Sequence, residues 1–442
     1  MRRNVHTFGS LIDDGTLSVT DGYRAKNVEL GGDGLLFLRA GHVTDTHINF
    51  EGVDRFSKAL APKLEDKTSR PGDVAVTTKG NSTGRTTFVT EDMPTFVYSP
   101  HLSRWRSLDH DILCPGFLRY WSRGREFVEQ LHGMMVSTDM APYLSLRDQR
   151  LLRIMLPTID EQRAIASVLG SLDDKIELNR RMNHTLEQMA AAIFKAWFVD
   201  FEPVRAKASG ATSFPSMPQP AFDALPTTFV NSELGPIPDG WEVKPFSDCV
   251  TIWSGGTPKR SESSFWGGDI PWYSVKDAPS ESDAWVIDTS EKITQEGLDG
   301  SAAKLLPIGT TIISARGTVG TLALTAIPMA MNQSCYGLEG VAGAGSYLTY
   351  WRTRQAVDLL RQRSHGSVFD TITRDTFDGV PIVTAPPAVL SAFDKVVEGS
   401  MHLMKQSGTE SRILAETRDA LLPKLLSGEV RVESIVIEEA LA

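Results

Sequence analysis

The sequence contains few of the residues that stabilise secreted or membrane proteins. Its 442 residues include three cysteines, Cys114, Cys249 and Cys335, which lie far apart and form no CxxC or His/Cys cluster. This spacing argues against a disulfide framework and a zinc site, and favours small buried apolar side chains. No run of about 18 apolar residues exists, and the N-terminal MRRNVHTFGS has no apolar stretch after its arginines. We therefore expect a cytoplasmic protein without a membrane partner.

Known catalytic motifs are also missing. The P-loop pattern GxxxxGK[ST], HExxH and an NPP[YF] methyltransferase loop do not occur. The segment PDGWEVK at 238–244 resembles the acidic motif of a metal nuclease only superficially. Two residues between Asp239 and Glu242 leave no room for the hairpin that such a site needs. We expect no catalytic residue, no metal site and no cofactor on this chain.

An excess of basic charge is missing as well. The chain has 45 Lys and Arg against 55 Asp and Glu, a net charge of -10. Non-specific coating of nucleic acid needs clustered cations, so this balance argues against it. The first 158 residues are nevertheless nearly neutral, and the acidic surplus lies in the later segments. The composition is that of a globular chain, and the length predicts two to four domains.

The chain contains an internal repeat. Residues 163–204 match residues 391–432 at a constant offset of 228. Upstream, FLRYW at 117 corresponds to YLTYW at 347, and the segment RPGDVAVTTKGNSTG corresponds to LPIGTTIISARGTVG. Because a duplicated unit constrains architecture more than local propensity does, we predict two copies of one unit. Each copy is a mixed α/β domain followed by a long helix.

The repeated long segments show heptad spacing of apolar residues, which predicts helices. Residues 160–198 would form a rod of roughly 58 Å at 1.5 Å per residue. Such a stripe often packs inside one domain, but two in one chain favour packing on each other as an antiparallel coiled coil. Asn179 within the row fixes the register or lies in solvent. The predicted interface residues are Ile165, Leu169, Leu172, Ile176, Leu186, Ile193, Phe393, Val397, Leu414 and Leu421.

These patterns predict an α+β fold of two mixed domains separated by two long antiparallel helices, with an internal pseudo-two-fold repeat. Seven prolines between residues 203 and 238 predict an extended connector that returns the chain along the rod. The expected segments are a first domain at 1–158, a first helix at 159–202, the connector at 203–238, a second domain at 239–387, and a second helix with a tail at 388–442.

Polar loops with cations recur in both copies. A loop such as TTKGNSTGR is usually a solvated turn when it occurs once, but its recurrence favours contact with phosphates and base edges. The DNA-contact candidates are Thr77, Thr78, Lys79, Asn81, Ser82, Arg85, Arg104 and Arg106 in the first copy, and Lys259, Arg260, Lys276, Arg316, Thr318, Asn332 and Gln333 in the second.

The run IDEQRAIASVLGSLDDKIELNRRMNHTLEQ, the exit FVDFEPV and the later GPIPDGWEV resemble the specificity subunits of type I restriction-modification enzymes over essentially the whole chain. The second helix departs from the first copy with glycines at 399 and 408. The resemblance implies a non-catalytic subunit with two target recognition domains, each of which reads one half of a bipartite double-stranded DNA sequence. It implies that the helices set the spacer between the half-sites.

The resemblance also implies partners. Two modification subunits would bind S-adenosylmethionine and methylate adenine, and restriction subunits that use ATP and magnesium would join to cleave DNA. Two other interpretations remain: a non-catalytic coiled-coil scaffold that joins two protein-binding domains, and a self-contained restriction enzyme, which the missing motifs disfavour.

Overall fold

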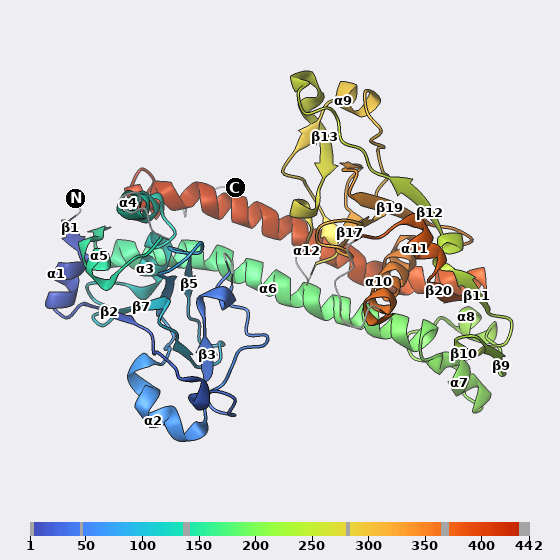
Figure 1. The fold of residues 1–442 in the computed structure, drawn as a ribbon, viewed down its shortest axis with the longest axis horizontal. Helices are drawn as coiled ribbons and strands as arrows, with labels where there is room; N and C mark the ends of the chain where they lie inside the picture. The colour runs from blue at the N-terminus through green and yellow to red at the C-terminus, as the bar shows by residue number, and fades with distance from the viewer. Residues whose placement is uncertain (1–3, 45–46, 136–141, 280–282, 364–370, 433–442) are drawn as a thin grey trace. The chain divides into compact units, whose positions relative to one another are not determined.

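The computed structural model describes residues 4–44, 47–135, 142–279, 283–363 and 371–432. The chain divides into two compact units: unit 1 comprises Met1–Asp174 and Leu414–Ala442, and unit 2 comprises Lys175–Ile413. Each unit contains one globular α+β domain and a part of each of two long helices, α6 (Ile159–Phe198) and α12 (Pro387–Ser427), as the ribbon in Figure 1 shows.

The first globular domain is built on a four-stranded antiparallel sheet with the order β2-β7-β4-β5. Strands β1 and β8 form an antiparallel pair, and β3 and β6 a parallel pair. Its strands are β1 (Asn4–Thr7), β2 (Leu17–Asp21), β3 (Leu36–Leu38), β4 (Val74–Thr77), β5 (Thr86–Phe88), β6 (Phe96–Tyr98), β7 (Leu102–Ser107) and β8 (Arg153–Leu156). Its helices are α1 (Phe8–Asp13), α2 (Ala61–Leu64), α3 (Pro115–Trp121), α4 (Arg125–Met135) and α5 (Leu146–Leu151).

The second globular domain has a five-stranded sheet with the order β12-β19-β16-β17-β14, in which β14 runs parallel to β17. Its strands are β11 (Glu242–Pro245), β12 (Val250–Ser254), β13 (Trp266–Tyr273), β14 (Trp285–Val286), β15 (Lys292–Ile293), β16 (Thr311–Ser314), β17 (Leu322–Thr325), β18 (Ala330–Met331), β19 (Cys335–Gly340) and β20 (Pro381–Thr384). Its helices are α9 (Gln295–Asp299), α10 (Ser346–Arg363) and α11 (Arg374–Asp378). Short 3-10 helices in the chain occupy Asn27–Glu29, Ala40–His42, Lys58–Leu60, Glu65–Lys67, Phe246–Cys249, Ser263–Phe265 and Val275–Asp277.

The strand pairing of the two domains confirms the duplication. The order β2-β7-β4-β5 is repeated by β12-β19-β16-β17, strand for strand along the chain. The antiparallel pair β1-β8 corresponds to β11-β20, and the parallel pair β3-β6 corresponds to β13-β18. The pairing of β13 with β15 corresponds to isolated antiparallel bridges of Leu30 with Phe56 and of Leu36 with Arg55, and β14 is an addition of the second copy. The repeat that the sequence shows at the helices therefore extends through both globular domains.

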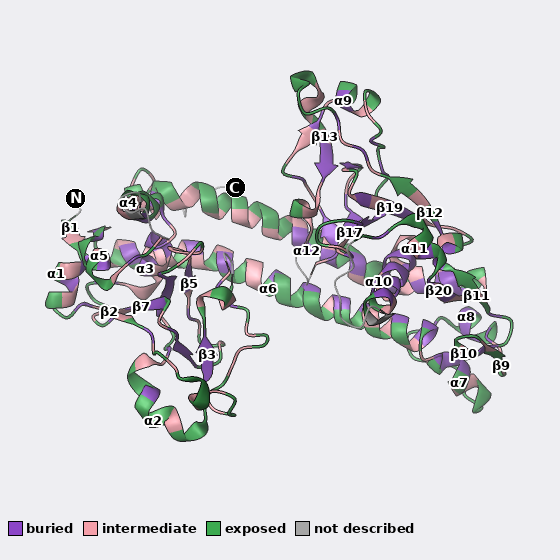
Figure 2. Ribbon diagram, viewed as in Figure 1, coloured by how far each residue is buried: buried purple, intermediate pink, exposed green. Residues whose placement is uncertain are grey.

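Both long helices form as the heptad pattern predicts. Helix α6 begins with Asp160 and Glu161, where negative charge interacts favourably with the helix dipole. Helix α12 continues through Gly399, Gly408 and Pro423, and Gly428 follows its last turn with a positive φ of 76°. Figure 2 marks the buried residues of both helices in purple, and on α12 they lie between Val389 and Gly408, with Leu425 near the end of the helix. Packing of these residues explains why α12 tolerates Gly399 and Gly408, which would weaken an isolated helix.

In unit 2 the two helices run antiparallel and pack through aromatic side chains. The ring of Phe393 on α12 lies 5.9 Å from Phe194, 6.0 Å from Trp197 and 5.5 Å from Phe198 on α6. Further along, the amide of Asn183 donates to the Met404 carbonyl oxygen at 3.4 Å. Residue numbers thus rise on α6 as they fall on α12.

Asn179 is buried, with 1% of its surface exposed. Its amide donates to the carboxylate of Glu410 at 2.8 Å, to the hydroxyl of Ser411 at 3.2 Å and to the Ser407 carbonyl oxygen at 3.3 Å. Next to it, the hydroxyl of Ser407 donates a hydrogen bond to Oδ1 of Asn183. Asn179 therefore does not lie in solvent: it is buried, and its amide is hydrogen-bonded to residues of α12.

The expectation of an extended connector is wrong. Residues 202–238 fold into α7 (Glu202–Ala208), α8 (Gln219–Asp223) and the hairpin of β9 (Phe229–Ser232) and β10 (Gly235–Pro238). Val204, Phe222 and Ile237 join the same hydrophobic cluster as Phe393, which explains the compact form. Five of the seven prolines lie at the starts of helices or in the hairpin, where a fixed φ and a missing N–H are tolerated, and Pro215 and Pro226 lie in turns or loops.

Among the described residues, no helix is both long and apolar enough to cross a membrane. Within the same residues, no group of three or more His, Cys, Asp or Glu side chains is arranged to hold a metal ion.

Candidate nucleic-acid interface

The loop between β4 and β5 is closed by the hydroxyl of Thr77. This oxygen accepts from the Arg85 N–H at 3.0 Å and donates to the Ser82 carbonyl oxygen. The Gly84 N–H donates to the Thr77 carbonyl oxygen at 2.8 Å. The clasp leaves the side chains of Lys79 and Asn81 exposed on the outside of the loop.

The loop between β16 and β17 in the second domain has the same construction. The hydroxyl of Ser314 accepts from the Thr321 N–H at 2.9 Å and donates to the Thr318 carbonyl oxygen. The Gly320 N–H donates to the Ser314 carbonyl oxygen at 2.9 Å. Arg316 is exposed on this loop and follows the clasping residue by two positions, as Lys79 follows Thr77. Both domains therefore present one exposed cation on a rigid loop at the same strand end.

Glycines allow each loop to approach the helix behind it. Gly84 has a φ of +90°, and a Cβ on it would lie 1.9 Å from Cδ2 of Leu131 on α4. Gly320 has a φ of +82°, and its Cβ would lie 2.9 Å from Cγ1 of Val357 on α10. Gly80, with a φ of +88°, has nothing within 4 Å of such a Cβ. Gly84 and Gly320 therefore carry a packing constraint in addition to a backbone one.

We expect Gly84→Ala to destabilise the protein by about 2 to 4 kcal/mol, since it adds a clash with a buried leucine to the strain of a positive φ. Gly80→Ala is the matched control, and it should cost only about 1 to 2 kcal/mol for the backbone alone. Urea unfolding of both variants measures the difference. Equal losses of stability would contradict the packing role of Gly84.

The other candidates of the first loop are less accessible. Thr77 and Thr78 are 0% and 5% exposed, and Ser82 is half-buried. The guanidinium of Arg85 donates to the Val43 carbonyl oxygen at 2.9 Å, which holds the side chain against the domain. The hydroxyl of Thr77 is hydrogen-bonded within the loop, and the DNA contact expected of Thr77 stays a prediction.

Arg104 and Arg106 on β7 are also used inside the domain. Arg106 holds Asp73 with two bonds, Nε to Oδ1 at 2.6 Å and Nη2 to Oδ2 at 2.7 Å, and Asp73 is fully buried. Arg104 is 6% exposed and donates to the Asp66 carbonyl oxygen and the Ser18 hydroxyl. Burial lowers the pKa of Arg104, and the charge of Arg106 adds to this effect. Most donors of these two arginines are used inside the domain, although Nε of Arg104 has no hydrogen-bond partner among the described residues. The DNA contacts expected of Arg104 and Arg106 stay predictions.

Arg260 in the second domain is exposed but held in place. Its guanidinium lies 3.8 Å from the ring centre of Trp266 and 5.1 Å from that of Trp272. Its Nη2 also donates to Oε2 of Glu291 at 2.9 Å. The paired carboxylate raises the pKa of Arg260. This arrangement fixes the direction of the arginine and offsets much of its charge.

The remaining second-domain candidates lie at the surface. Lys259, Lys276, Thr318 and Gln333 are exposed. Asn332 is half-buried, and its Oδ1 accepts from the Ser334 N–H at 3.0 Å.

The predicted helix-interface residues fall into three groups. Phe393 and Val397 are buried in the aromatic cluster of unit 2, and Leu186 and Ile193 pack against it. Ile165 and Leu169 are buried in the core of unit 1 with Leu421 packed against them. Leu172, Ile176 and Leu414 are half-buried.

Sequence patterns missed a cluster of arginines in unit 1. Asp173 on α6 pairs with Arg119 of α3 at 2.6 Å, with Arg418 of α12 at 2.7 Å and with Arg123 at 3.6 Å. The hydroxyl of Tyr120 donates to the same carboxylate at 2.9 Å. In the sequence, two features pointed to this cluster: the acidic Asp173 directly follows Leu172 of the apolar row, and the segment FLRYWSRGR contains several arginines. Neither type of signal identifies partners that are distant in sequence.

Comparison with known proteins gives a match to one family model. Residues 238–387 match the type I restriction modification DNA specificity domain. The chain is 27% identical to the specificity subunit of the type I restriction enzyme HindI from Haemophilus influenzae, over 84% of this chain and 89% of that protein. It is also 27% identical to the MjaIX specificity subunit from Methanocaldococcus jannaschii, over 64% of this chain and 61% of that protein.

Among solved structures, the chain is similar to the S subunit of a type I restriction-modification system from M. genitalium. The TM-score is 0.56 with 15% sequence identity, and the similarity covers 96% of each chain. At this identity the likeness concerns the fold alone.

Proposed function

We propose that this chain is a specificity subunit of a type I restriction-modification system and that it reads a bipartite DNA sequence. Each globular domain would recognise one half-site, and we refer to the two as recognition domains 1 and 2. The chain itself would carry no catalysis.

The duplicated clasped loop is the observation that carries this proposal. Thr77 and Ser314 close equivalent loops, and each loop presents an exposed cation, Lys79 or Arg316, at the end of a buried strand. Lysine and arginine donate to phosphates and to the O6 and N7 acceptors of guanine. Two equivalent loops in one chain suit two half-sites, whereas a single-site DNA-binding protein needs only one.

Chemistry would be supplied by partner subunits. Two modification subunits would bind S-adenosylmethionine and methylate adenine, and restriction subunits with ATP and magnesium would add cleavage. The net charge of -10 suits this division, because phosphate neutralisation by partners would compensate for the weak binding expected of the chain alone. The assembly would act on DNA in the cytoplasm.

Arg316→Ala tests the assignment of a loop to a half-site. If Arg316 reads a guanine, the change should cost about 1 to 3 kcal/mol of binding free energy and relax one base position of one half-site. Lys79→Ala should affect the other half-site. The measurement is sequencing of methylated sites in cells that express each variant with its modification subunits.

Lys244→Ala is the matched control, because Lys244 is an exposed cation of the same domain that pairs with Glu242 at 2.7 Å. It should leave the methylated sequence unchanged. A uniform loss of methylation over all sequences would instead mark Arg316 as a phosphate contact. A complex that protects no bipartite site, with or without its partner subunits, would favour the scaffold function.

A further inference from the structure

The cluster of Arg119, Arg123 and Arg418 around Asp173 has more positive than negative charge. The three side chains are 17%, 24% and 22% exposed, and Asp173 is 9% exposed. Asp419 adds one carboxylate at 2.8 Å from Arg418, but it is 65% exposed. Within the described residues, no other carboxylate lies within ion-pair distance of these three guanidiniums. Three largely buried guanidiniums therefore share the one buried carboxylate of Asp173.

This excess of positive charge raises the free energy of the folded protein unless a further anion joins the cluster. Burial lowers the pKa of Arg123, and the charge of Arg119 adds to the effect, so its cation is poorly compensated where it stands. Arg123 has the longest contact to Asp173, at 3.6 Å. The Nε of Arg119 is buried and has no hydrogen-bond partner. Arginine remains protonated at neutral pH, so the cluster keeps its charge and attracts an anion.

The corresponding anchor of unit 2 has the opposite balance. There Arg354 of α10 pairs with Glu187 of α6, which is 8% exposed. Asp283 lies in the same electrostatic environment, where burial raises its pKa to about 6 and Glu187 adds to the effect. The indole N–H of Trp285 bonds the Met401 carbonyl oxygen of α12 at 2.9 Å. A globular domain can therefore be held on the helices without an excess of arginine. Anchoring alone does not account for the excess of positive charge in unit 1.

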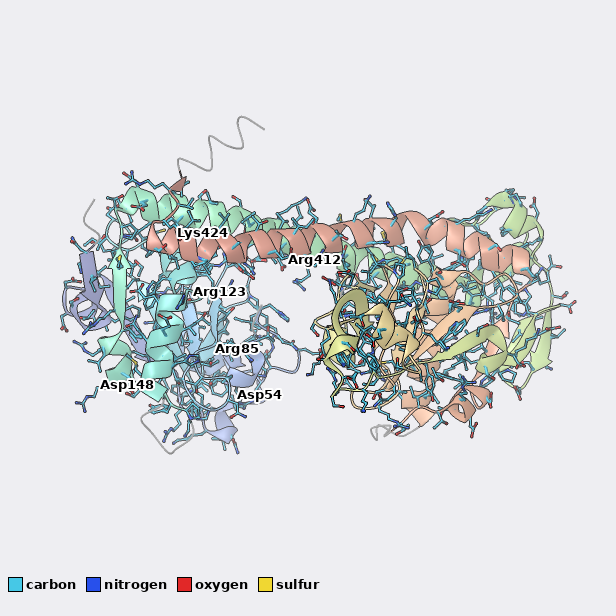
Figure 3. All side chains as sticks on the ribbon, turned by 90° about the horizontal axis from the view of Figure 1, so that it is seen from above. Asp54, Arg85, Arg123, Asp148, Arg412 and Lys424 are labelled. Carbon is cyan, nitrogen blue, oxygen red and sulfur yellow. The ribbon has the colours of Figure 1, made fainter. Side chains whose placement is uncertain are left out.

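The arginine cluster lies beside β5, the strand that leaves the clasped loop of recognition domain 1. The hydroxyl of Ser122 donates to that of Thr86 at 3.2 Å, so the backbone segments that carry Arg123 and Arg85 are joined one residue away from each arginine. The guanidinium of Arg119 lies 5.1 Å from the ring centre of Phe88 on β5, the strand that leaves the loop. Figure 3 shows Arg123 between Arg85 and Lys424 in this view of unit 1.

We propose that the cluster of Arg119, Arg123 and Arg418 binds a phosphate of the DNA backbone beside the bases that recognition domain 1 reads. This inference rests on the proposed function and adds a phosphate contact to which helix α12 contributes through Arg418. Guanidinium groups suit phosphate because their planar forks donate two bonds to its oxygens. A DNA strand held at the loop carries its charges in a continuous row, so a neighbouring phosphate is available to the cluster.

The test is Arg123→Gln in the full chain assembled with its modification subunits. Arg119 and Arg418 still neutralise Asp173 in this variant, so we expect the fold to persist. Binding is measured by fluorescence anisotropy over a salt series, with a duplex that contains the methylated site and with one that lacks it. Both affinities should fall by a common factor of roughly 3 to 10, and the slope of log K against log salt should decrease by about one. The methylated sequence should not change.

Two variants serve as controls. Arg125→Gln removes a nearby exposed arginine that pairs with Glu129 at 2.6 Å, and it should leave the affinity and the salt slope unchanged. Arg123→Lys keeps the charge and should recover most of the affinity. Ethylation interference on the wild-type complex should identify a phosphate, outside the bases read by domain 1, whose modification weakens binding; this measurement does not depend on the stability of any variant.

The proposal is overturned if Arg123→Gln folds and retains the wild-type salt slope, or if no such phosphate is found. It is also overturned if the variant loses only its modification subunits, since the anion would then be a carboxylate of that partner. Failure of the proposed function gives a different result: the wild-type assembly would bind both duplexes equally and methylate no bipartite site.

Discussion

Replacing Asp173 with alanine is expected to lower the free energy of unfolding by about 3 to 5 kcal/mol. The change removes the one buried anion from among three guanidiniums, and it leaves Arg119, Arg123 and Arg418 to repel one another. It also removes the acceptor of the buried Tyr120 hydroxyl. Because the cluster joins α3, α6 and α12, the loss should detach the end of α12 from unit 1.

Urea unfolding at several pH values measures this effect. Burial opposes ionisation of Asp173, but the charges of Arg119, Arg418 and Arg123 outweigh it and hold the pKa of the carboxyl below its usual value. A lowered pKa in the folded state stabilises the protein above the unfolded value, and this contribution is lost as the pH falls through the folded value. The difference between wild type and variant should therefore be full at neutral pH and shrink below pH 3.8.

Asp174→Ala is the matched control for this prediction, because Asp174 is the next residue of the same helix and is exposed. It should change the stability by less than about 0.5 kcal/mol. Equal effects of the two substitutions would contradict the account of the arginine cluster.

Phe393→Ala should have an effect of similar size in unit 2. Phe393 is 0% exposed and contacts three aromatic rings of α6, at centroid distances between 5.5 and 6.0 Å. Truncating a buried phenylalanine leaves a cavity and typically costs about 3 to 5 kcal/mol. The same cluster includes Val389 and Leu390 of α12 and the folded connector, so the substitution weakens the packing of that whole region.

Thermal unfolding of Phe393→Ala measures this loss, and Leu403→Ala is its control. Leu403 lies on the same helix but is 46% exposed, so its truncation should change the stability by less than about 0.5 kcal/mol. A Phe393→Ala variant as stable as the Leu403→Ala variant would show that the aromatic cluster does not hold the helix pair in unit 2.

Periodic features of this fold could be predicted from the sequence. The heptads predicted α6 and α12 because burial along one stripe repeats with the helix period. The internal repeat predicted matching domains because equivalent strands carry equivalent apolar runs. The loops with Lys79 and Arg316 were found because glycines with positive φ leave a clear signature at a strand end.

Features that depend on long-range partners could not be predicted. Arg104 and Arg106 look like surface cations in sequence, and only the fold brings Asp73 and Asp66 to their guanidiniums. The proline-rich connector folds because its few apolar residues reach the aromatic cluster of α6 and α12, which no local pattern announces. The same holds for Asp173 and Arg418, which are 245 positions apart.

The central claim is that each globular domain specifies one half of a bipartite DNA target. The most direct test exchanges residues 239–386 for the equivalent domain of a type I specificity subunit of known target and sequences the methylated sites of cells that express the chimaera with the modification subunits. One half-site is expected to change to that of the donor while the other half-site is retained. Two unchanged half-sites, or a simultaneous change of both, would contradict it.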